Sequence, residues 1–118
     1  MDQDIKQKSR AFAVKLILLQ KQLISRRKES VISEELLRCG AGVGAELSKA
    51  ECALSKNDQI AKVYLSLQNC AETKYWLELL NETDYLTEFE FNETLKDCDE
   101  LGKLLIAQIK TLKAGLTQ

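Results

Sequence analysis

Histidine and proline are absent from this chain of 118 residues, and glycine occurs only five times. Without histidine, one chain cannot form a Ser-His or Cys-His nucleophile pair, a histidine-ligated zinc site or the Glu-x-x-His sites of di-iron bundles. No stretch approaches the ~18 consecutive apolar residues of a membrane helix. We therefore expect a protein that is not an enzyme, binds no metal, cofactor or small-molecule substrate, and does not enter a membrane.

The cysteines are few and widely spaced, at Cys39, Cys52, Cys70 and Cys98. Their spacings of 13, 18 and 28 residues include no close pair of the kind that binds zinc. The N-terminus opens with acidic residues and has no apolar run that could act as a signal peptide. We therefore expect a cytoplasmic protein, in which the cysteines are small buried hydrophobic residues.

Charge is balanced overall, with 17 basic and 18 acidic side chains, but it is divided unevenly along the chain. Residues 1–62 carry 12 Lys or Arg against 8 Asp or Glu, a net charge of +4. Residues 63–118 carry 5 against 10, a net charge of −5. Two interpretations are open: ordinary solvated helix surfaces, or basic and acidic faces that meet between neighbouring subunits.

Apolar residues recur at helical spacing along nearly the whole chain, which predicts an all-α protein. Helices are expected over about residues 6–27, from 31 or 33 to 54, over 58–81, and from a capping box at Thr87 and Glu90 onward. Ser55 or Asn57 should cap the third helix. Because the connections are short, the helices should form one antiparallel up-down-up-down four-helix bundle over residues 1–118.

Two of the expected helices carry more apolar surface than one interface needs. In the first, a face that includes Phe12 and Leu16 is widened by Val14, Ile17, Leu18 and Ile24, which predicts a central helix or a contact between subunits. In the third, the apolar stripe is Ile60, Val63, Leu67, Cys70 and Leu77, interrupted by Lys74. Trp76 and Leu80 add a second face there, so two neighbours are again implied.

The run from Gly40 to Ala45 spells GxGxxA, the glycine pattern of dinucleotide-binding folds, but its context does not fit that function. The residues before it have helix composition, and a stripe at four- and three-residue steps passes through it: Leu36, Gly40, Val43, Leu47, Ala50 and Leu54. Gly40, Gly42 and Gly44 should therefore lie inside a helix and allow close packing, with Trp76 or Phe12 against them.

The sequence resembles the bacterial four-helix-bundle proteins known as 23S rRNA intervening sequence proteins. The resemblance covers nearly the whole chain and rests on residues 8–14 (KSRAFAV), 36–45 (LLRCGAGVGA), 75–80 (YWLELL), 85–87 (YLT) and 96–100 (KDCDE). It implies an antiparallel four-helix bundle that assembles as a homopentameric ring. The chain is also similar to the accessory protein of diversity-generating retroelements, a pentameric bundle that contacts nucleic acid and a reverse transcriptase.

The resemblance also directs attention to three charged residues. Arg38 and Glu72 match the family pattern, whereas Glu46 stands where the family usually has Asn. A buried glutamate needs a basic partner more than an asparagine does. We therefore predict an interhelical network in which Arg38 pairs with Glu72 or Glu46 and sets the bundle register; ordinary solvated charges are the alternative.

The resemblance favours a homo-oligomer that binds RNA, DNA or a nucleic-acid enzyme. Basic residues in two groups are the candidate phosphate contacts: Arg26, Arg27 and Lys28, and Lys6, Lys8, Arg10 and Lys15. The acidic second half and the lack of aromatic residues among these cations argue against strong binding. The alternative is an adaptor that binds a helix of another protein and no nucleic acid.

Overall fold

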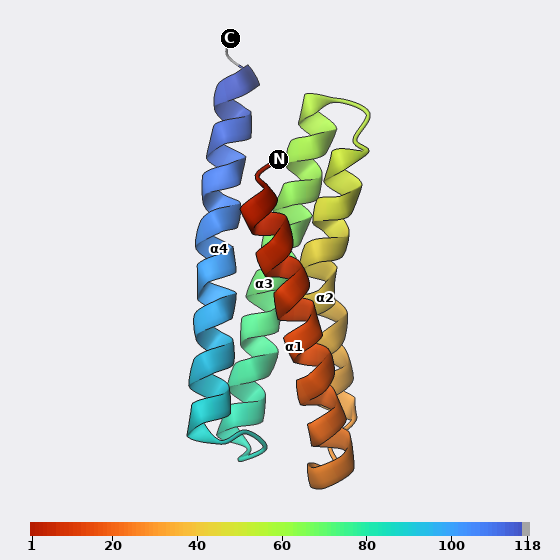
Figure 1. Ribbon diagram of the computed structural model, residues 1–118, viewed down its shortest axis with the longest axis vertical. Helices are drawn as coiled ribbons and strands as arrows, with labels where there is room; N and C mark the ends of the chain where they lie inside the picture. Colours follow the sequence, from red (N-terminus) through yellow and green to blue (C-terminus); the bar gives the residue numbers. More distant parts are fainter. Residues whose placement is uncertain (117–118) are drawn as a thin grey trace.

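The computed structural model describes residues 1–116, which form four antiparallel α-helices (Figure 1). Their bounds are Gln3–Arg27 for α1, Val31–Glu51 for α2, Lys56–Glu82 for α3 and Glu88–Leu116 for α4. The bundle is elongated, with extents of 52 × 21 × 20 Å, and the start of α1 and the end of α4 lie toward the same end of it. The expected all-α four-helix bundle is confirmed.

Side-chain caps explain where three of the helices begin. The carboxylate of Asp2 accepts a hydrogen bond from the amide of Asp4 at 3.0 Å, so α1 starts three residues earlier than expected. Ser55 caps α3 by accepting from the Asp58 amide at 3.1 Å. The capping box before α4 is confirmed, since Thr87 and Glu90 each donate a backbone N–H to the other's side chain, at 2.8 and 3.1 Å.

The connection between α1 and α2 depends on two consecutive residues. Lys28 adopts a left-handed conformation with φ of 58° and ends α1. Glu29 is buried, and its carboxylate accepts hydrogen bonds from the amides of Val31, Ile32 and Ser33 at 3.2, 3.1 and 2.7 Å. A carboxylate satisfies the free N–H groups at a helix start and interacts favourably with the helix dipole. This cap fixes the first turn of α2.

The end of α2 corrects the sequence prediction. The helix stops at Glu51, and Leu54, expected in its apolar stripe, is 97% exposed in the connection to α3. There the backbone amide of Leu54 donates to the carboxylate of Asp58 at 3.1 Å. The four- and three-residue spacing reached Leu54, but no helix lies opposite it to cover its side chain.

The buried face of α3 is rotated from the one the apolar pattern predicts. Ser66 and Thr73 are fully buried, whereas Leu67 is only partly buried and Lys74 is exposed. The Ser66 hydroxyl donates to the carbonyl of Val43 on α2 at 2.8 Å. A buried hydroxyl with a partner is tolerated where an unpaired one is not. The contact between α2 and α3 therefore contains paired polar groups as well as apolar residues.

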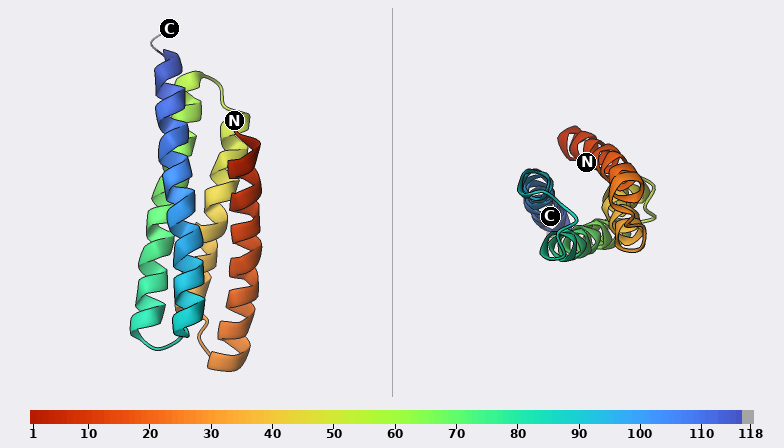
Figure 2. Two further views of the ribbon diagram at one scale, coloured as in Figure 1. Left: turned by 60° about the vertical axis from the view of Figure 1, so that its left-hand side comes forward. Right: turned by 90° about the horizontal axis from the view of Figure 1, so that it is seen from below.

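The helices follow one another around the bundle axis in chain order, as the end-on view of Figure 2 shows. α2 packs against α1 and α3, α3 packs against α4, and α1 and α4 approach each other over the fewest residues. α1 is therefore not the central helix that was one of its two expected roles. Within residues 3–116, no helix has both the length and the apolarity that a membrane span requires.

Candidate functional site

Three of the seven candidate phosphate contacts are already paired with carboxylates of the same chain. Lys6 lies 2.6 Å from Glu51 on α2. On the other side of α1, Lys8 and Lys15 lie 2.5 and 2.6 Å from Glu100 and Asp97 of α4. The Glu100 carboxylate raises the pKa of Lys8, and Lys6 lowers the pKa of Glu51. These lysines connect α1 to its neighbours.

Two more of the candidates also have partners within the fold. Arg27 donates to the carbonyl of Tyr85 at 2.6 Å and lies 3.6 Å from the carboxylate of Glu90. Lys28 ends α1 and donates through its ammonium group to the carbonyl of Ser25 at 3.0 Å. Arg27 therefore holds the start of α4 against the end of α1. The sequence places these cations but does not show which acid or carbonyl each one meets.

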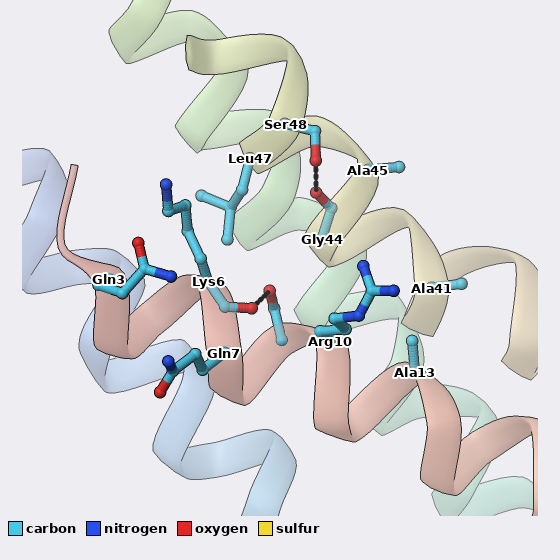
Figure 3. Close-up of a pocket in the computed structure, with 11 residues that line it drawn as sticks. Gln3, Lys6, Gln7, Arg10, Ala13, Ala41, Gly44, Ala45, Leu47 and Ser48 are labelled. Carbon is cyan, nitrogen blue, oxygen red and sulfur yellow. Dashed lines mark hydrogen bonds between the residues drawn. The ribbon is translucent and has the colours of Figure 1, made fainter.

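Arg10 and Arg26 are the remaining two candidates, and both are exposed. Within residues 1–116, neither guanidinium forms an ion pair or a side-chain hydrogen bond. Arg10 lines a hollow of about 400 Å³ between α1 and α2, where Figure 3 shows it together with Gln7, Ala41 and Ser48. Arg26 lies in the last turn of α1. These two are the cations of the group that are available to an outside phosphate.

The hollow lies where glycines bring α1 and α2 close together. A Cβ atom added at Gly40 would come within 2.0 Å of the Leu16 side chain and 3.7 Å of Phe12, and one at Gly44 would lie 3.2 Å from the Ser9 hydroxyl. Phe12 therefore packs against the glycine run as expected, together with Leu16.

The middle glycine of the run, Gly42, faces α3, and Trp76 does not take the place expected for it. The side chain nearest to Gly42 is that of Asn69 on α3, which would lie within 2.8 Å of a Cβ atom added at this glycine. Trp76 is instead partly buried on α3, and its indole N–H donates to the Glu72 carboxylate at 2.9 Å. Its ring also lies edge-on to that of Tyr75, with the centroids 5.0 Å apart. The glycine run therefore takes part in two helix contacts: Gly40 and Gly44 face α1, and Gly42 faces α3.

The outer face of α1 carries exposed apolar residues alongside the exposed cations Arg10 and Lys21. Its buried face is formed by Ile5, Ser9, Phe12, Leu16, Leu19 and Leu23. On the opposite side, Val14, Ile17, Leu18 and Ile24 are 41 to 55% exposed. We call these four residues the outer stripe. Isolated exposed apolar residues are common, but four on one helix face are characteristic of an interaction surface.

The expected interhelical ion pair between Arg38 and Glu72 is present. Arg38 also lies 2.8 Å from Glu35 one turn earlier in α2. The hydrogen bond from Trp76, followed by the Arg38 guanidinium, lowers the pKa of Glu72. Glu46 is not part of this network: it lies 3.1 Å from Lys49, and its Oε2 is buried without a hydrogen-bond partner among residues 1–116.

Two of the four cysteines meet in the fold, a pairing that the sequence pattern did not predict. Cys70 of α3 and Cys98 of α4 are buried with their sulfur atoms 3.7 Å apart. Cys70 lies on the apolar stripe expected for the third helix, and Cys98 lies on the buried face of α4, the next helix in the chain. Across the part of the chain that the structure describes, no three His, Cys, Asp or Glu side chains are grouped to hold a metal ion.

The four antiparallel helices define a small four-helix-bundle protein. Its helix α1 has exposed apolar residues, and charged residues connect α1 with α4. The chain belongs to the 23S rRNA-intervening sequence protein family, whose sequence profile matches residues 1–107. It is similar to a solved protein of unknown function from the S23 ribosomal protein family of Bacteroides thetaiotaomicron VPI-5482. The two share 42% identity over 90% of this chain and 98% of the other, with a TM-score of 0.88. No curated protein matches the chain. Neither the family nor the solved relative is described as catalytic.

Proposed function

We propose that this protein is a non-enzymatic subunit of a homo-oligomer, a pentameric ring, that binds nucleic acid or an enzyme acting on nucleic acid. The observation that carries the proposal is the outer stripe of α1, directly opposite the face that α1 buries in its own bundle. Burying four such side chains against a second copy removes apolar area from water, which drives association. The opposite charges of the two halves of the chain are used in part within one subunit, as in the pairs Lys8–Glu100 and Lys15–Asp97, so the outer stripe is the main support for assembly.

The nucleic-acid part of the proposal is supported by the family description and by two side chains. The family takes its name from an intervening sequence of 23S rRNA, and the solved relative is assigned to a ribosomal protein family. Arg10 and Arg26 are exposed, and a ring would repeat each of them once per subunit. Repeated guanidinium groups at fixed spacing would bind a phosphate backbone without reading its sequence.

Assembly is tested by light scattering after size-exclusion chromatography. The wild-type protein should have a mass several times the 13.4 kDa of one chain. A variant with Ile17→Glu and Leu18→Glu should have the mass of a monomer and retain its helical circular dichroism, because both side chains point away from the bundle core. Leu54→Glu is the matched control, since Leu54 is exposed outside the outer stripe. A wild-type monomer at micromolar concentration would contradict the ring.

Nucleic-acid binding is tested by fluorescence anisotropy with single- and double-stranded RNA and DNA over a salt series. Replacing Arg10 and Arg26 with alanine should weaken binding to every sequence and reduce the slope of log K against log salt by about 1 per lost phosphate contact. Lys8→Ala is the control, because Lys8 is already paired with Glu100. If Lys8→Ala weakens binding as much as the arginine variant does, the assignment of these arginines is wrong.

The second candidate function is an adaptor that binds a helix of another protein. It is favoured by Phe89, which is 74% exposed and lines a hollow between α1 and α4. The hollow is continuous with the outer stripe through Leu18, and its other lining residues are mostly polar or charged, among them Lys15, Glu90 and Glu93. Amphipathic helices bind in hollows of this kind. The salt series separates the two functions, since an oligomer with no affinity for any nucleic acid even at low salt would support the adaptor.

A further inference from the structure

The thiols of Cys70 and Cys98 face each other across the contact between α3 and α4. Their sulfur atoms are 3.7 Å apart, and each is close to the other residue's backbone carbonyl, at 3.2 and 3.4 Å. A disulfide needs about 2 Å between its sulfur atoms, so the two side chains must rotate toward each other to form one. The other two cysteines lack this arrangement: Cys39 lies beside the Thr73 hydroxyl at 3.2 Å, and Cys52 is exposed.

A groove reaches this thiol pair from the surface. It has a volume of about 360 Å³ and is lined by both cysteines, by Lys74 and Ala71 of α3, and by Gly102 of α4. A Cβ atom at Gly102 would lie 3.8 Å from the Cys70 sulfur, in ordinary van der Waals contact with it. Cys70 is only 4% exposed, and the absence of a side chain at Gly102 leaves a space beside its sulfur that a methyl group would occupy.

The surroundings of the two sulfur atoms give them different chemistry. The hydrogen bond from Cys98 lowers the pKa of Cys70, against burial and the charge of Asp99, which raise it. The same sulfur contact, together with burial, raises the pKa of Cys98. A thiolate is the nucleophilic form of cysteine. Of the two sulfur atoms, that of Cys70 lies beside the open space at Gly102, which makes Cys70 the group of the pair that meets a small molecule in the groove first.

We propose that Cys70 and Cys98 form an oxidation site for small peroxides, in which Cys70 reacts with the peroxide and Cys98 then closes a disulfide between α3 and α4. The site is independent of the ring and of any nucleic acid. Its substrate class follows from the access route, because the groove admits a small molecule to a sulfur that is otherwise buried.

The two steps balance without any further reactant. The Cys70 thiolate attacks one oxygen of hydrogen peroxide, an S–O bond forms as the O–O bond breaks, and the leaving hydroxide takes a proton to become water. The Cys98 sulfur then attacks the sulfenic sulfur of Cys70, the S–S bond forms, and the S–O bond breaks with release of a second water as Cys98 gives up its proton. Two thiols are oxidised by two electrons, and one peroxide is reduced to two waters.

The product would fasten α4 to the rest of the bundle. α4 contacts α3 extensively but approaches α1 over few residues, so a covalent link to α3 removes its main route of detachment. Oxidation should therefore raise the Tm of the protein without changing its helix content. In the reducing cytoplasm predicted for the chain, the pair stays as thiols until a peroxide reaches it.

The test uses the full-length protein with Cys52→Ser, which removes the exposed competing thiol. After treatment with hydrogen peroxide, intact mass spectrometry should show a loss of about 2 Da, and digestion should give a peptide pair linked through Cys70 and Cys98. Adding Cys98→Ser should stop the reaction at a sulfenic acid that dimedone traps on Cys70, whereas adding Cys70→Ser should leave Cys98 unreacted.

Gly102→Ala tests the access route without threatening the fold. Alanine favours a helix over glycine, and a methyl group fits at 3.8 Å, so the variant should be at least as stable as its parent. Its disulfide should nevertheless form at least about threefold more slowly, because the methyl group covers the Cys70 sulfur. Gly115→Ala is the matched control on the same helix, since nothing lies within 4 Å of its Cβ position.

Three results would overturn the proposal. One is the absence of a Cys70–Cys98 linkage in the folded protein. Another is a linkage that joins Cys39 to either residue instead. The third is an equal oxidation rate for Gly102→Ala and Gly115→Ala, which would show that peroxide does not arrive by the groove.

Discussion

The interface between α2 and α3 and the interface between α1 and α4 are held together by different interactions. Between α2 and α3, the Ser66 hydroxyl reaches a carbonyl on the opposite helix, and Thr73 lies beside Cys39, all of them buried. Gly42 on α2 accommodates Asn69 of α3. Buried hydrogen bonds and close backbone approach fix a helix pair in one register.

The α1–α4 interface has ion pairs along its edges in addition to buried apolar residues. Lys8, Lys15 and Arg27 of α1 pair with acids of α4, at distances of 2.5 to 3.6 Å, and all six side chains are partly exposed. Hollows of about 340 and 190 Å³ lie along the same interface. Exposed ion pairs add little stability and are screened by salt. The stability of this bundle is therefore concentrated around α2, and α1 and α4 can separate at lower cost.

The largest effect is expected at Gly40, where α1 packs on α2. Gly40→Leu should lower the free energy of unfolding by about 3 kcal/mol, because even a Cβ atom would come within 2.0 Å of Leu16. Urea denaturation followed by circular dichroism measures the change. Gly115→Leu is the control and should leave the protein at least as stable, since that position is open. Equal losses from both variants would show that close packing at Gly40 contributes nothing.

A smaller effect is expected at Ser66 on the α2–α3 interface. Ser66→Ala should lower the free energy of unfolding by about 1 kcal/mol, because a buried hydrogen bond to the Val43 carbonyl is lost. Ser25→Ala is the control, since the exposed Ser25 hydroxyl donates only within its own helix, to Lys21. Stability that falls equally in both variants would mean that the interhelical bond is worth no more than a local one.

A still smaller effect is expected from the ion pair between Lys15 and Asp97 on the α1–α4 interface. A double-mutant cycle with alanine at both positions should give a coupling energy of about 0.5 kcal/mol at low salt. In 1 M sodium chloride the coupling should shrink, because the Debye length falls to about 3 Å. A coupling energy above about 2 kcal/mol that persists at high salt would show that the charges of the α1–α4 interface stabilise the bundle more than the buried hydrogen bond between α2 and α3 does.

The smallest effect is a pH dependence at the edge of the α2–α3 interface. Trp76 and Arg38 lower the pKa of Glu72 in the folded protein. Their contacts with the ionised Glu72 carboxylate therefore stabilise the fold at pH values above the ordinary glutamate pKa of about 4.3. This contribution is lost as the pH falls through the lowered pKa. The free energy of unfolding of the Glu72→Gln variant should therefore be lower than that of the wild type at pH 7, and the difference should shrink at low pH. The single tryptophan supplies the fluorescence signal, and a stability difference that stays constant with pH would contradict the assignment.

The helices could be predicted from sequence because each depends on local signals. Apolar spacing, the Ser55 cap and the capping box at Thr87 all act within a few residues, and all three are present in the structure. The predicted extension of α2 to Leu54 was wrong because the end of this helix depends on contacts between helices, which are not local in the sequence. Whether an apolar residue at the end of a stripe stays helical depends on a neighbouring helix that covers it, and the sequence does not show this.

The surface could be predicted only in part, because its charges are paired by the fold. Lys8 and Lys15 look like free cations in the sequence, but their acids lie 92 and 82 positions further along the chain. The buried face of α3 was predicted only in part, for a related reason: Ile60, Val63, Cys70 and Leu77 are buried as expected, but polar residues complete the face. Ser66 and Thr73 are polar and were not counted as core residues, yet each is buried with a partner on α2 that becomes visible only when the helices are packed.

The order of the helices around the axis also bears on how fast the chain folds. Apart from the sparse contact of α1 with α4, every helix packs on the one that precedes or follows it in sequence. A topology of such short-range contacts has a low relative contact order, and proteins of that kind fold within microseconds to milliseconds. The first three helices can therefore pack together while α4 is still being synthesised. When α4 leaves the ribosome, the surface of α3 on which it packs is already formed.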